Sequence, residues 1–401
     1  MRVKNKRLYT FLLIPFFRPL GLEVSRFHFL YFLFTAWEAV AIALFAILLF
    51  KSRGSLVLKK HDDSRFIKIY ILYSFVISIF FKFINGNSLI PLIGLLSFCF
   101  SALIVLYIAN RDYKFIIDFF YQYLLIVNIF NALFIVIPPL KSLITLSEYF
   151  FIGHRQAVPM VWALSVMLCS LKYHERKGKV KGREILRLLL YVGVASYNIL
   201  NASVSTGLVV IGIFAVMYII MVVLNKFEKI NDAAMYILFI AGLIINYLII
   251  TFNIQDYFSY YLAKYLGETT SLNGRIVIFN AFRRAALGAP LFGYGYKGIK
   301  VSTGWGGAWD SLDYAHNTLL QELTNGGAIG LILFIAMSLA AIHSSMKSEK
   351  LNHKKIVLCT LVSELVIMCT ESVNYYGYYM VFIVLINYLH KLDMTWDDNG
   401  Y

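Results

Sequence analysis

Long runs of apolar residues, each about 16–24 residues long, recur along the chain. A helix needs about 20 apolar residues to cross a bilayer, whereas a strand of an outer-membrane barrel alternates apolar and polar positions over about 10 residues. The pattern therefore predicts an all-α polytopic membrane protein with about twelve transmembrane helices, forming a single transmembrane domain over residues 1–401. The predicted spans are 8–20, 27–50, 66–84, 88–109, 116–139, 157–173, 186–200, 203–224, 233–252, 326–345, 356–372 and 374–390.

The first run differs from the others because it is short and contains Pro15 and Pro19. Proline inside a helix removes a hydrogen bond and predicts a kink. No small-residue cleavage site follows the basic start of the chain, so we expect the first helix to be retained.

The composition strengthens the membrane prediction. Hydrophobic residues make up 60% of the 401 residues and charged residues only 15%. A soluble domain has no interior large enough to hide so much apolar surface, and a disordered chain carries far less of it. The four cysteines lie inside apolar runs, so they indicate neither a disulfide framework nor a metal site.

Basic residues are distributed unevenly between the two sides of the predicted membrane. The formal net charge is +15. If the N-terminus is cytoplasmic, 25 of the 37 Lys and Arg residues fall in cytoplasmic segments, as the positive-inside rule requires. Both termini are therefore expected in the cytoplasm. Because the basic residues are spread over loops that face anionic lipid, they do not indicate a nucleic-acid partner.

One predicted outside loop is far longer than the rest. Residues 253–315 form a segment of 63 residues that contains nine of the 25 glycines. Long loops in compact proteins are usually functional. We therefore expect the chemistry to lie in this large extracytoplasmic loop.

Within this loop a helix is predicted that begins with Arg275 and continues over 276–287, and it carries three candidate arginines. Arg275 and Arg284 are nine residues apart, so they face opposite ways, with Arg275 free to point into a cavity while Arg284 meets headgroups. Arg283 lies between these directions. After the helix, Gly293, Tyr294 and Gly295 form a turn whose backbone can approach a ligand closely, although such turns are also common without any ligand.

A histidine follows where the polar loop meets an apolar helix. His316, next to Asn317, lies where an imidazole is partly desolvated yet open to proton exchange. Two arrangements are therefore open at this point: a catalytic histidine, or an interfacial side chain that contacts headgroups.

These motifs together resemble the signature of the O-antigen polymerase/ligase superfamily. The pattern is G-R, about a dozen residues, P-L-F-G-Y-G, a variable stretch, and A-H-N-x-x-L-Q followed by two glycines. Twelve spans with one large outside loop late in the chain extend the resemblance over the whole sequence. The matching residues are Gly274, Arg275, Pro290–Gly295, Ala315–Asn317, Leu320, Gln321, Gly327 and Gly330.

The resemblance implies a GT-C-like fold and a Wzy-type polymerase in the cytoplasmic (inner) membrane. Such an enzyme joins undecaprenyl-diphosphate-linked oligosaccharide repeats into an O-antigen, capsule or exopolysaccharide on the extracytoplasmic face. It implies catalytic roles for Arg275 and His316, and Arg155 resembles another outside-loop arginine of the family. A further family arginine has no counterpart in residues 201–207. A chain-length regulator and a flippase of the same pathway are implied partners, besides membrane lipid.

The residues also suit this chemistry by themselves. Guanidinium groups stabilise the charge that develops on a leaving diphosphate, and an imidazole can take the proton of the attacking hydroxyl. Attack from the opposite face would invert the anomeric centre. Asp310 and Asp313 are separated by two residues and form no DxD pair, so we expect transfer without a metal or cofactor. The substrate-binding candidates are Arg155, Arg283, Gly293, Tyr294, Gly295 and Asn317.

Two other functions fit parts of the pattern. A ligase of the same superfamily would move finished glycan to a terminal acceptor. A flippase or secondary transporter would show related halves with matching broken helices, and the sequence shows no such repeat. The remaining carboxylates in or near the spans, including Glu371 at the outside end of its helix, are expected to be structural or to orient a catalytic group. Tyr294, Tyr296, Trp305 and Trp309 are candidates for stacking on sugar rings.

The predicted sidedness can be tested by labelling single cysteines with a membrane-impermeant maleimide. In a variant without native cysteines, Lys300→Cys should be labelled in intact spheroplasts, because residue 300 lies in the predicted outside loop. The control Lys177→Cys, in a predicted cytoplasmic loop, should react only after permeabilisation. The opposite labelling pattern would reverse the topology.

Overall fold

The computed structural model describes residues 2–51, 64–85, 90–174, 182–227, 230, 232–252, 260–261, 264, 274–304, 310–373 and 376–394. These residues form a helical bundle with one two-stranded antiparallel sheet. The α-helices are α1 (Arg2–Leu13), α2 (His28–Lys51), α3 (Arg65–Asn85), α4 (Ile90–Arg111), α5 (Tyr113–Val136), α6 (Pro138–Lys141), α7 (Val158–His174), α8 (Gly182–Asn201), α9 (Ser205–Tyr218), α10 (Asp232–Phe252), α12 (Arg275–Gly288), α13 (Thr318–Ser345), α14 (Leu351–Thr370), α15 (Gly377–Asn387) and α16 (His390–Met394). The other elements are 3-10 turns η1 (Ile14–Phe17), η2 (Leu20–Leu22) and η3 (Arg155–Ala157), the π-helical turn η4 (Ile219–Val223), and strands β1 (Val301–Ser302) and β2 (Ser311–Leu312).

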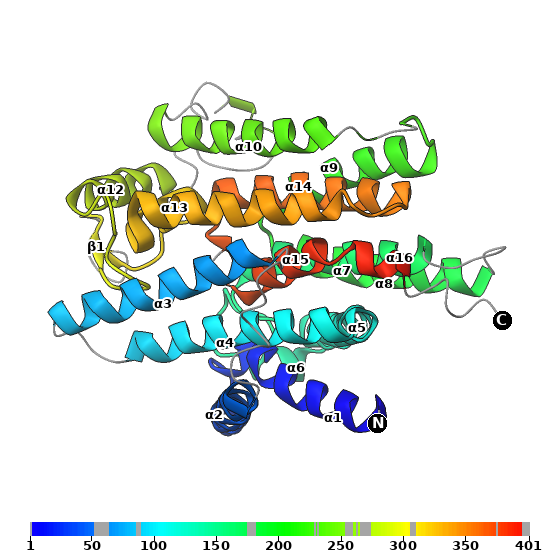
Figure 1. The fold of residues 1–401 in the computed structure, drawn as a ribbon, viewed down its shortest axis with the longest axis horizontal. Coiled ribbons are helices and arrows are strands. Elements are labelled where there is room, and N and C mark those ends of the chain that lie inside the picture. The colour runs from blue at the N-terminus through cyan, green and yellow to red at the C-terminus, as the bar shows by residue number, and fades with distance from the viewer. Residues whose placement is uncertain are drawn as a thin grey trace.

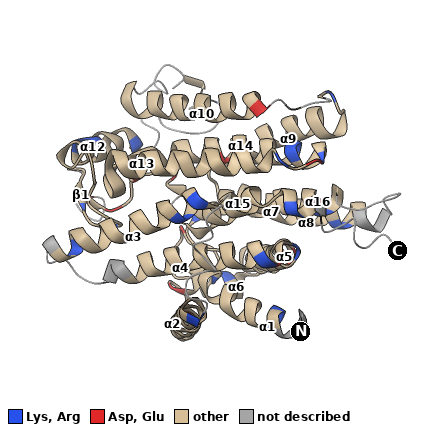
Figure 2. Ribbon diagram, viewed as in Figure 1, with Lys and Arg blue, Asp and Glu red and all other residues tan. Residues whose placement is uncertain are grey.

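Within the described residues, seven helices are long and apolar enough to cross a membrane. Helices suit lipid because each satisfies its own backbone hydrogen bonds. Figure 2 shows that most of the ribbon along these helices carries no charged residue. The prediction of an all-α protein with several membrane-spanning helices agrees with this architecture. The count of twelve spans stays a prediction, although each predicted range overlaps a helix.

The long helices are packed side by side. The described residues 274–304 and 310–315 of the large predicted loop, here called the late loop, lie at one end of them. Helices α3, α4, α13 and α14 run across the view in Figure 1, whereas α2 is seen nearly end-on. Helix α12 and strand β1 gather at the end of the bundle where α13 begins (Figure 1). Helix α14 is in the middle of the core, because it packs against α7, α9, α10 and α13.

Prolines explain where two helices depart from the predicted spans. Helix α1 ends at Leu13, and Pro15 follows in the 3-10 turn η1, which is the break expected in the first run. Helix α5 ends at Val136, earlier than predicted, because Ile137 precedes Pro138 and takes an extended conformation.

Helix α13 begins eight residues before the predicted span 326–345, since its polar first turns are buried in protein and need not be apolar.

Two ion pairs connect segments of the bundle, one buried and one partly exposed. Glu38 forms an ion pair with Arg18. The carboxylate of Asp118 accepts a hydrogen bond from the Lys172 ammonium at 2.6 Å. An unpaired ion in an apolar interior costs several kcal/mol, so each pair ties two segments together.

A break inside α13 joins this helix to the glycine turn of the late loop. Gly327 has φ 62° and ψ −163°, a conformation that only glycine adopts readily. The break frees the carbonyls of Thr324 and Asn325, which accept hydrogen bonds from the backbone N–H groups of Tyr294 and Gly295, both at 2.8 Å. Two N–H groups after the break donate in return to carbonyls of the loop, Ala328 to Pro290 at 2.8 Å and Ile329 to Leu291 at 3.2 Å.

The glycines of this junction are required by the close approach of the two backbones. A Cβ atom at Gly293 would lie 2.6 Å from backbone atoms of residues 324–327, and one at Gly327 would lie 2.3 Å from the backbone of Leu291. The two glycine motifs of the sequence are therefore two halves of one backbone junction.

We predict that Gly327→Ala lowers the free energy of unfolding by at least about 1–3 kcal/mol, because it adds backbone strain to a steric clash. The matched control is Gly212→Ala in α9, where a new Cβ meets no atom within 4 Å and alanine favours the helix. Thermal unfolding in detergent measures both. Equal midpoints for Gly327→Ala and the wild type would contradict the junction.

Candidate functional site

The candidate site is built around one buried carboxylate. Glu371 follows the end of α14, and its side chain is fully buried. Oε1 accepts a hydrogen bond from Nη2 of Arg275 at 3.0 Å, and Oε2 accepts one from the Tyr314 hydroxyl at 3.2 Å. Nδ1 of His316 lies 3.6 Å from the same Oε2. A buried carboxylate is stable only with such partners, so it draws three side chains of the late loop and its flanks to one point.

Hydrogen bonds between two side-chain hydroxyls and the backbone hold the segment around Glu371 against the start of α13. The Thr318 hydroxyl donates to the carbonyl of Glu371 at 2.7 Å and accepts from the N–H of Val373 at 3.1 Å. The N–H of Asn317 donates to the Ser372 hydroxyl at 3.3 Å. The geometry of the site therefore follows from the docking of the α14–α15 connection on the N-terminus of α13.

His316 is held in a strained position at the edge of this cluster. Its φ is 52°, in the left-handed region that side chains other than glycine rarely adopt. The ring of Tyr314 packs edge-on against it, with ring centroids 4.6 Å apart. Nε2 of the Gln156 amide lies 3.0 Å from its Nδ1. The side chain is 14% exposed, so the imidazole is largely desolvated but still reachable from outside the bundle.

Two of these groups come from parts of the sequence that had not been assigned a role. Gln156 is in η3, 160 residues before His316, and Tyr314 is two residues before it. Burial raises the pKa of Tyr314 well above its usual value, and Tyr376 and Glu371 raise it further. The hydroxyl therefore keeps its proton and donates a hydrogen bond to the carboxylate. Only the nearness of Gln156 to the predicted Arg155 could have drawn attention to it.

Arg155 lies beside the cluster rather than in it. Its Nη2 is 3.3 Å from Oε1 of Glu148, and both side chains are more than 40% exposed. The neighbouring His154 approaches the other oxygen of Glu148, with 3.3 Å from Nε2 to Oε2. Burial lowers the pKa of His154 and Arg155 adds to this, whereas Glu148 and Glu371 act in the opposite direction.

The predicted arginines of α12 separate as their spacing indicates. Arg275 is turned toward Glu371, whereas Arg283 and Arg284 are exposed. Arg283 donates to the carbonyl of Thr251 at 3.2 Å. Among the predicted arginines the structure thus brings Arg275 to the buried carboxylate and leaves Arg283 away from it.

Four of the predicted substrate-binding residues have structural tasks in this fold. Gly293 and Gly295 belong to the junction with α13, and the Tyr294 hydroxyl donates to the carbonyl of Ala285 at 3.1 Å. Asn317 is fully buried and caps α13, since its Oδ1 accepts from the N–H of Leu320 at 3.1 Å. Contact of these four with a substrate stays a prediction.

The aspartates of the loop are engaged in local structure. Oδ1 of Asp310, just before β2, accepts from the N–H of Gly304, just after β1, at 3.0 Å. Asp313 lies 3.8 Å from the Lys297 ammonium. Within the described part of the chain no group of three or more His, Cys, Asp and Glu side chains is placed to hold a metal ion. Trp305 and Trp309 lie outside the described residues.

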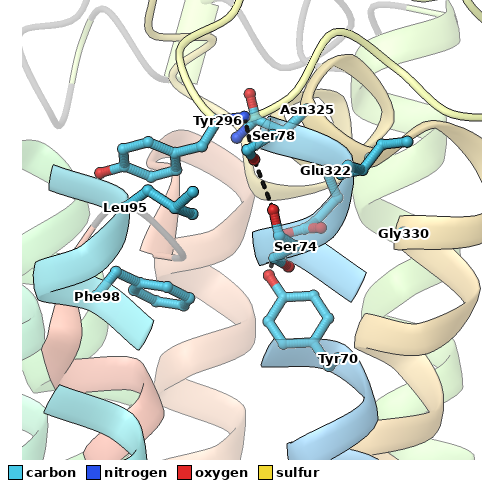
Figure 3. A pocket seen from close by; sticks show the side chains of 11 residues that line it. Tyr70, Ser74, Ser78, Leu95, Phe98, Tyr296, Glu322, Asn325 and Gly330 are labelled. Atoms are coloured by element: carbon cyan, nitrogen blue, oxygen red, sulfur yellow. Dashed lines mark hydrogen bonds between the residues drawn. The ribbon is translucent and has the colours of Figure 1, made fainter. Parts of the chain in front are cut away.

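A second polar position, at Glu322, is separate from the Glu371 cluster. Its Oε1 accepts from the Tyr70 hydroxyl at 2.6 Å, between α3 and α13. Figure 3 shows the small cavity beside it, with Ser78 and Tyr296 at the upper side and Tyr70 at the lower side. The cavity measures about 20 Å³, which is room for about one water molecule. Glu322 therefore helps to join two helices and faces a space too small for a sugar.

No protein-family model matches the chain, and no curated protein matches its sequence.

We predict that Glu371→Gln lowers the free energy of unfolding by about 3–5 kcal/mol, because it leaves the Arg275 charge partly buried without its partner. Arg275→Gln in the same background should restore part of this loss. Asp313→Asn is the matched control, and it should cost less than about 1 kcal/mol because its ion pair is long, at 3.8 Å, and partly exposed to solvent.

Thermal unfolding of the four proteins in one detergent gives the comparison. If Glu371→Gln were as stable as Asp313→Asn, Glu371 would not be a buried ion-pair partner.

Proposed function

We propose that the chain is a glycosyltransferase that polymerises surface polysaccharide from repeat units linked to undecaprenyl diphosphate. The observation that carries the proposal is the meeting of Arg275 and His316 at Glu371. These are the two residues to which the superfamily resemblance gave catalytic roles, and they lie 41 positions apart in the sequence. The site is proposed to face the extracytoplasmic side of the cytoplasmic membrane.

Arg275 suits the leaving group of this reaction. When the bond between the anomeric carbon and the diphosphate oxygen breaks, the electron pair and negative charge stay on the diphosphate. One guanidinium nitrogen of Arg275 is hydrogen-bonded to Glu371, which fixes the direction of the planar group. Its other N–H donors remain suited to a pair of phosphate oxygens. Such fixed charge stabilises the transition state without reorganisation.

His316 suits the attacking hydroxyl. The Glu371 carboxylate near Nδ1 favours a proton on that nitrogen, which leaves the lone pair of Nε2 to accept the hydroxyl proton. The structure places Nε2 of Gln156 3.0 Å from Nδ1, so this tautomer requires the amide to be turned by 180°, with its oxygen accepting from Nδ1. The hydroxyl oxygen then forms the new bond to the anomeric carbon, and the positive charge of the imidazolium is offset by Glu371. General-base help of this kind contributes about 10²–10⁴-fold in rate.

We predict that Arg275→Ala and His316→Ala each abolish long-chain glycan while single repeats accumulate on the lipid carrier. The matched control is Arg284→Ala on the same helix, whose side chain is exposed and away from Glu371. It should leave the glycan ladder unchanged. The measurement is the gel profile of surface glycan in a deletion strain that expresses each variant, together with the amount of membrane-inserted protein.

Normal polymer from either Arg275→Ala or His316→Ala would refute the site. Long chains that remain on the carrier in the deletion strain would identify a ligase instead.

A further inference from the structure

A polar cavity lies at the other end of α14 from Glu371. It is lined by the last residue of α7, by Asn225 just after η4, and by the first residues of α14. Its volume is about 430 Å³, within the range of cavities that hold small ligands. A helix of 20 residues is about 30 Å long, so this cavity and the Glu371 cluster are at opposite ends of the core.

A buried lysine stands behind the wall of this cavity. Lys355 is fully buried, and its ammonium donates to Oδ1 of Asn225 at 2.5 Å. Among the described residues no carboxylate forms an ion pair with it. A buried ammonium without a counter-charge is costly, which makes the cavity beside it favourable for an anion.

The backbone around Asn225 is shaped to present its side chain here. The five residues before Leu224 form a π-helical turn, a distortion that is often found at functional sites. Asn225 itself has φ 48°, in the left-handed region. Two uncommon backbone conformations therefore place one amide between Lys355 and the cavity.

A buried histidine also borders the cavity. His353 is fully buried, and its Nδ1 lies 3.2 Å from Oδ1 of Asp393. In the part of the chain that the structure describes, its Nε2 has no hydrogen-bond partner. The neighbouring Asn352 amide lies 3.4 Å from His174 Nδ1 across the cavity wall. A buried polar atom without a partner indicates a ligand or water that belongs beside it.

The start of α14 adds positive potential. Lys350 is the N-cap residue of α14, and it lines the cavity. The first backbone N–H groups of a helix have no partner within it, and together with the helix dipole they favour an anion. The stretch 347–355 is basic. Besides Lys350 it contains Lys347, Lys354 and Lys355, and its only acidic residue is Glu349.

We propose that this cavity binds a phosphate group, with Lys350 and His353 of its lining as the groups that recognise it and Lys355, behind Asn225, adding positive charge. The phosphate could belong to an anionic lipid headgroup or to a soluble phosphate compound, and both present the same chemistry. The site does not depend on the proposed transferase activity.

The test uses the full chain and two phosphate sources. Calorimetric titration with inorganic phosphate in nanodiscs of phosphatidylcholine measures the soluble source. Native mass spectrometry after purification in phosphatidylglycerol measures the retained lipid. Lys350→Gln is expected to weaken binding about tenfold or more through the loss of one charged donor, and Lys355→Met to act in the same direction. Lys354→Gln, on the same helix but outside the cavity lining, is the matched control.

A soluble ligand would be supported if inorganic phosphate binds saturably, and if Lys350→Gln weakens this binding while Lys354→Gln does not. Retained phosphatidylglycerol with the same dependence would support a lipid headgroup. The proposal would be overturned if neither phosphate source binds, or if Lys350→Gln and Lys354→Gln have equal effects on binding. If Lys355→Met does not fold, the comparison of Lys350→Gln with Lys354→Gln decides.

Discussion

The need to neutralise one buried carboxylate determines the geometry of the candidate site. Glu371 has no exposure to solvent, so its charge depends on the Arg275 guanidinium and the Tyr314 hydroxyl. These partners come from α12 and from the segment just before α13, so both are brought to the end of α14. The same carboxylate lies 3.6 Å from Nδ1 of His316. One electrostatic constraint therefore serves both stability and the proposed chemistry.

The broken helix α13 makes this arrangement possible. An unbroken helix would use its own carbonyls and N–H groups at residues 324–329, and the late loop would have no backbone partners there. The positive φ of Gly327 releases these groups, and the turn at Gly293 and Gly295 takes them up. Residues 275–295 of the loop are thereby held at both ends, by the Arg275–Glu371 ion pair and by the backbone junction with α13.

The sequence allowed the helices and the two central side chains to be predicted, but not how the site is assembled. Apolar runs locate helices because lipid imposes one length and one kind of surface. Arg275 and His316 stood out as polar residues in a motif. Gln156 could not be placed, because its contact with His316 joins positions 160 residues apart and leaves no local pattern. The glycine turn indicates a close backbone approach, and the approach that the structure shows is to the backbone of α13, which only the fold reveals.

The most direct measurement of the central claim is an electron cryo-microscopy map of the full chain in a nanodisc, at a resolution that shows side chains. The account predicts density that joins the Arg275 guanidinium to the Glu371 carboxylate, with the His316 imidazole beside them at the end of α14. A map in which Arg275 points into lipid, or in which His316 and Glu371 lie apart, would contradict it.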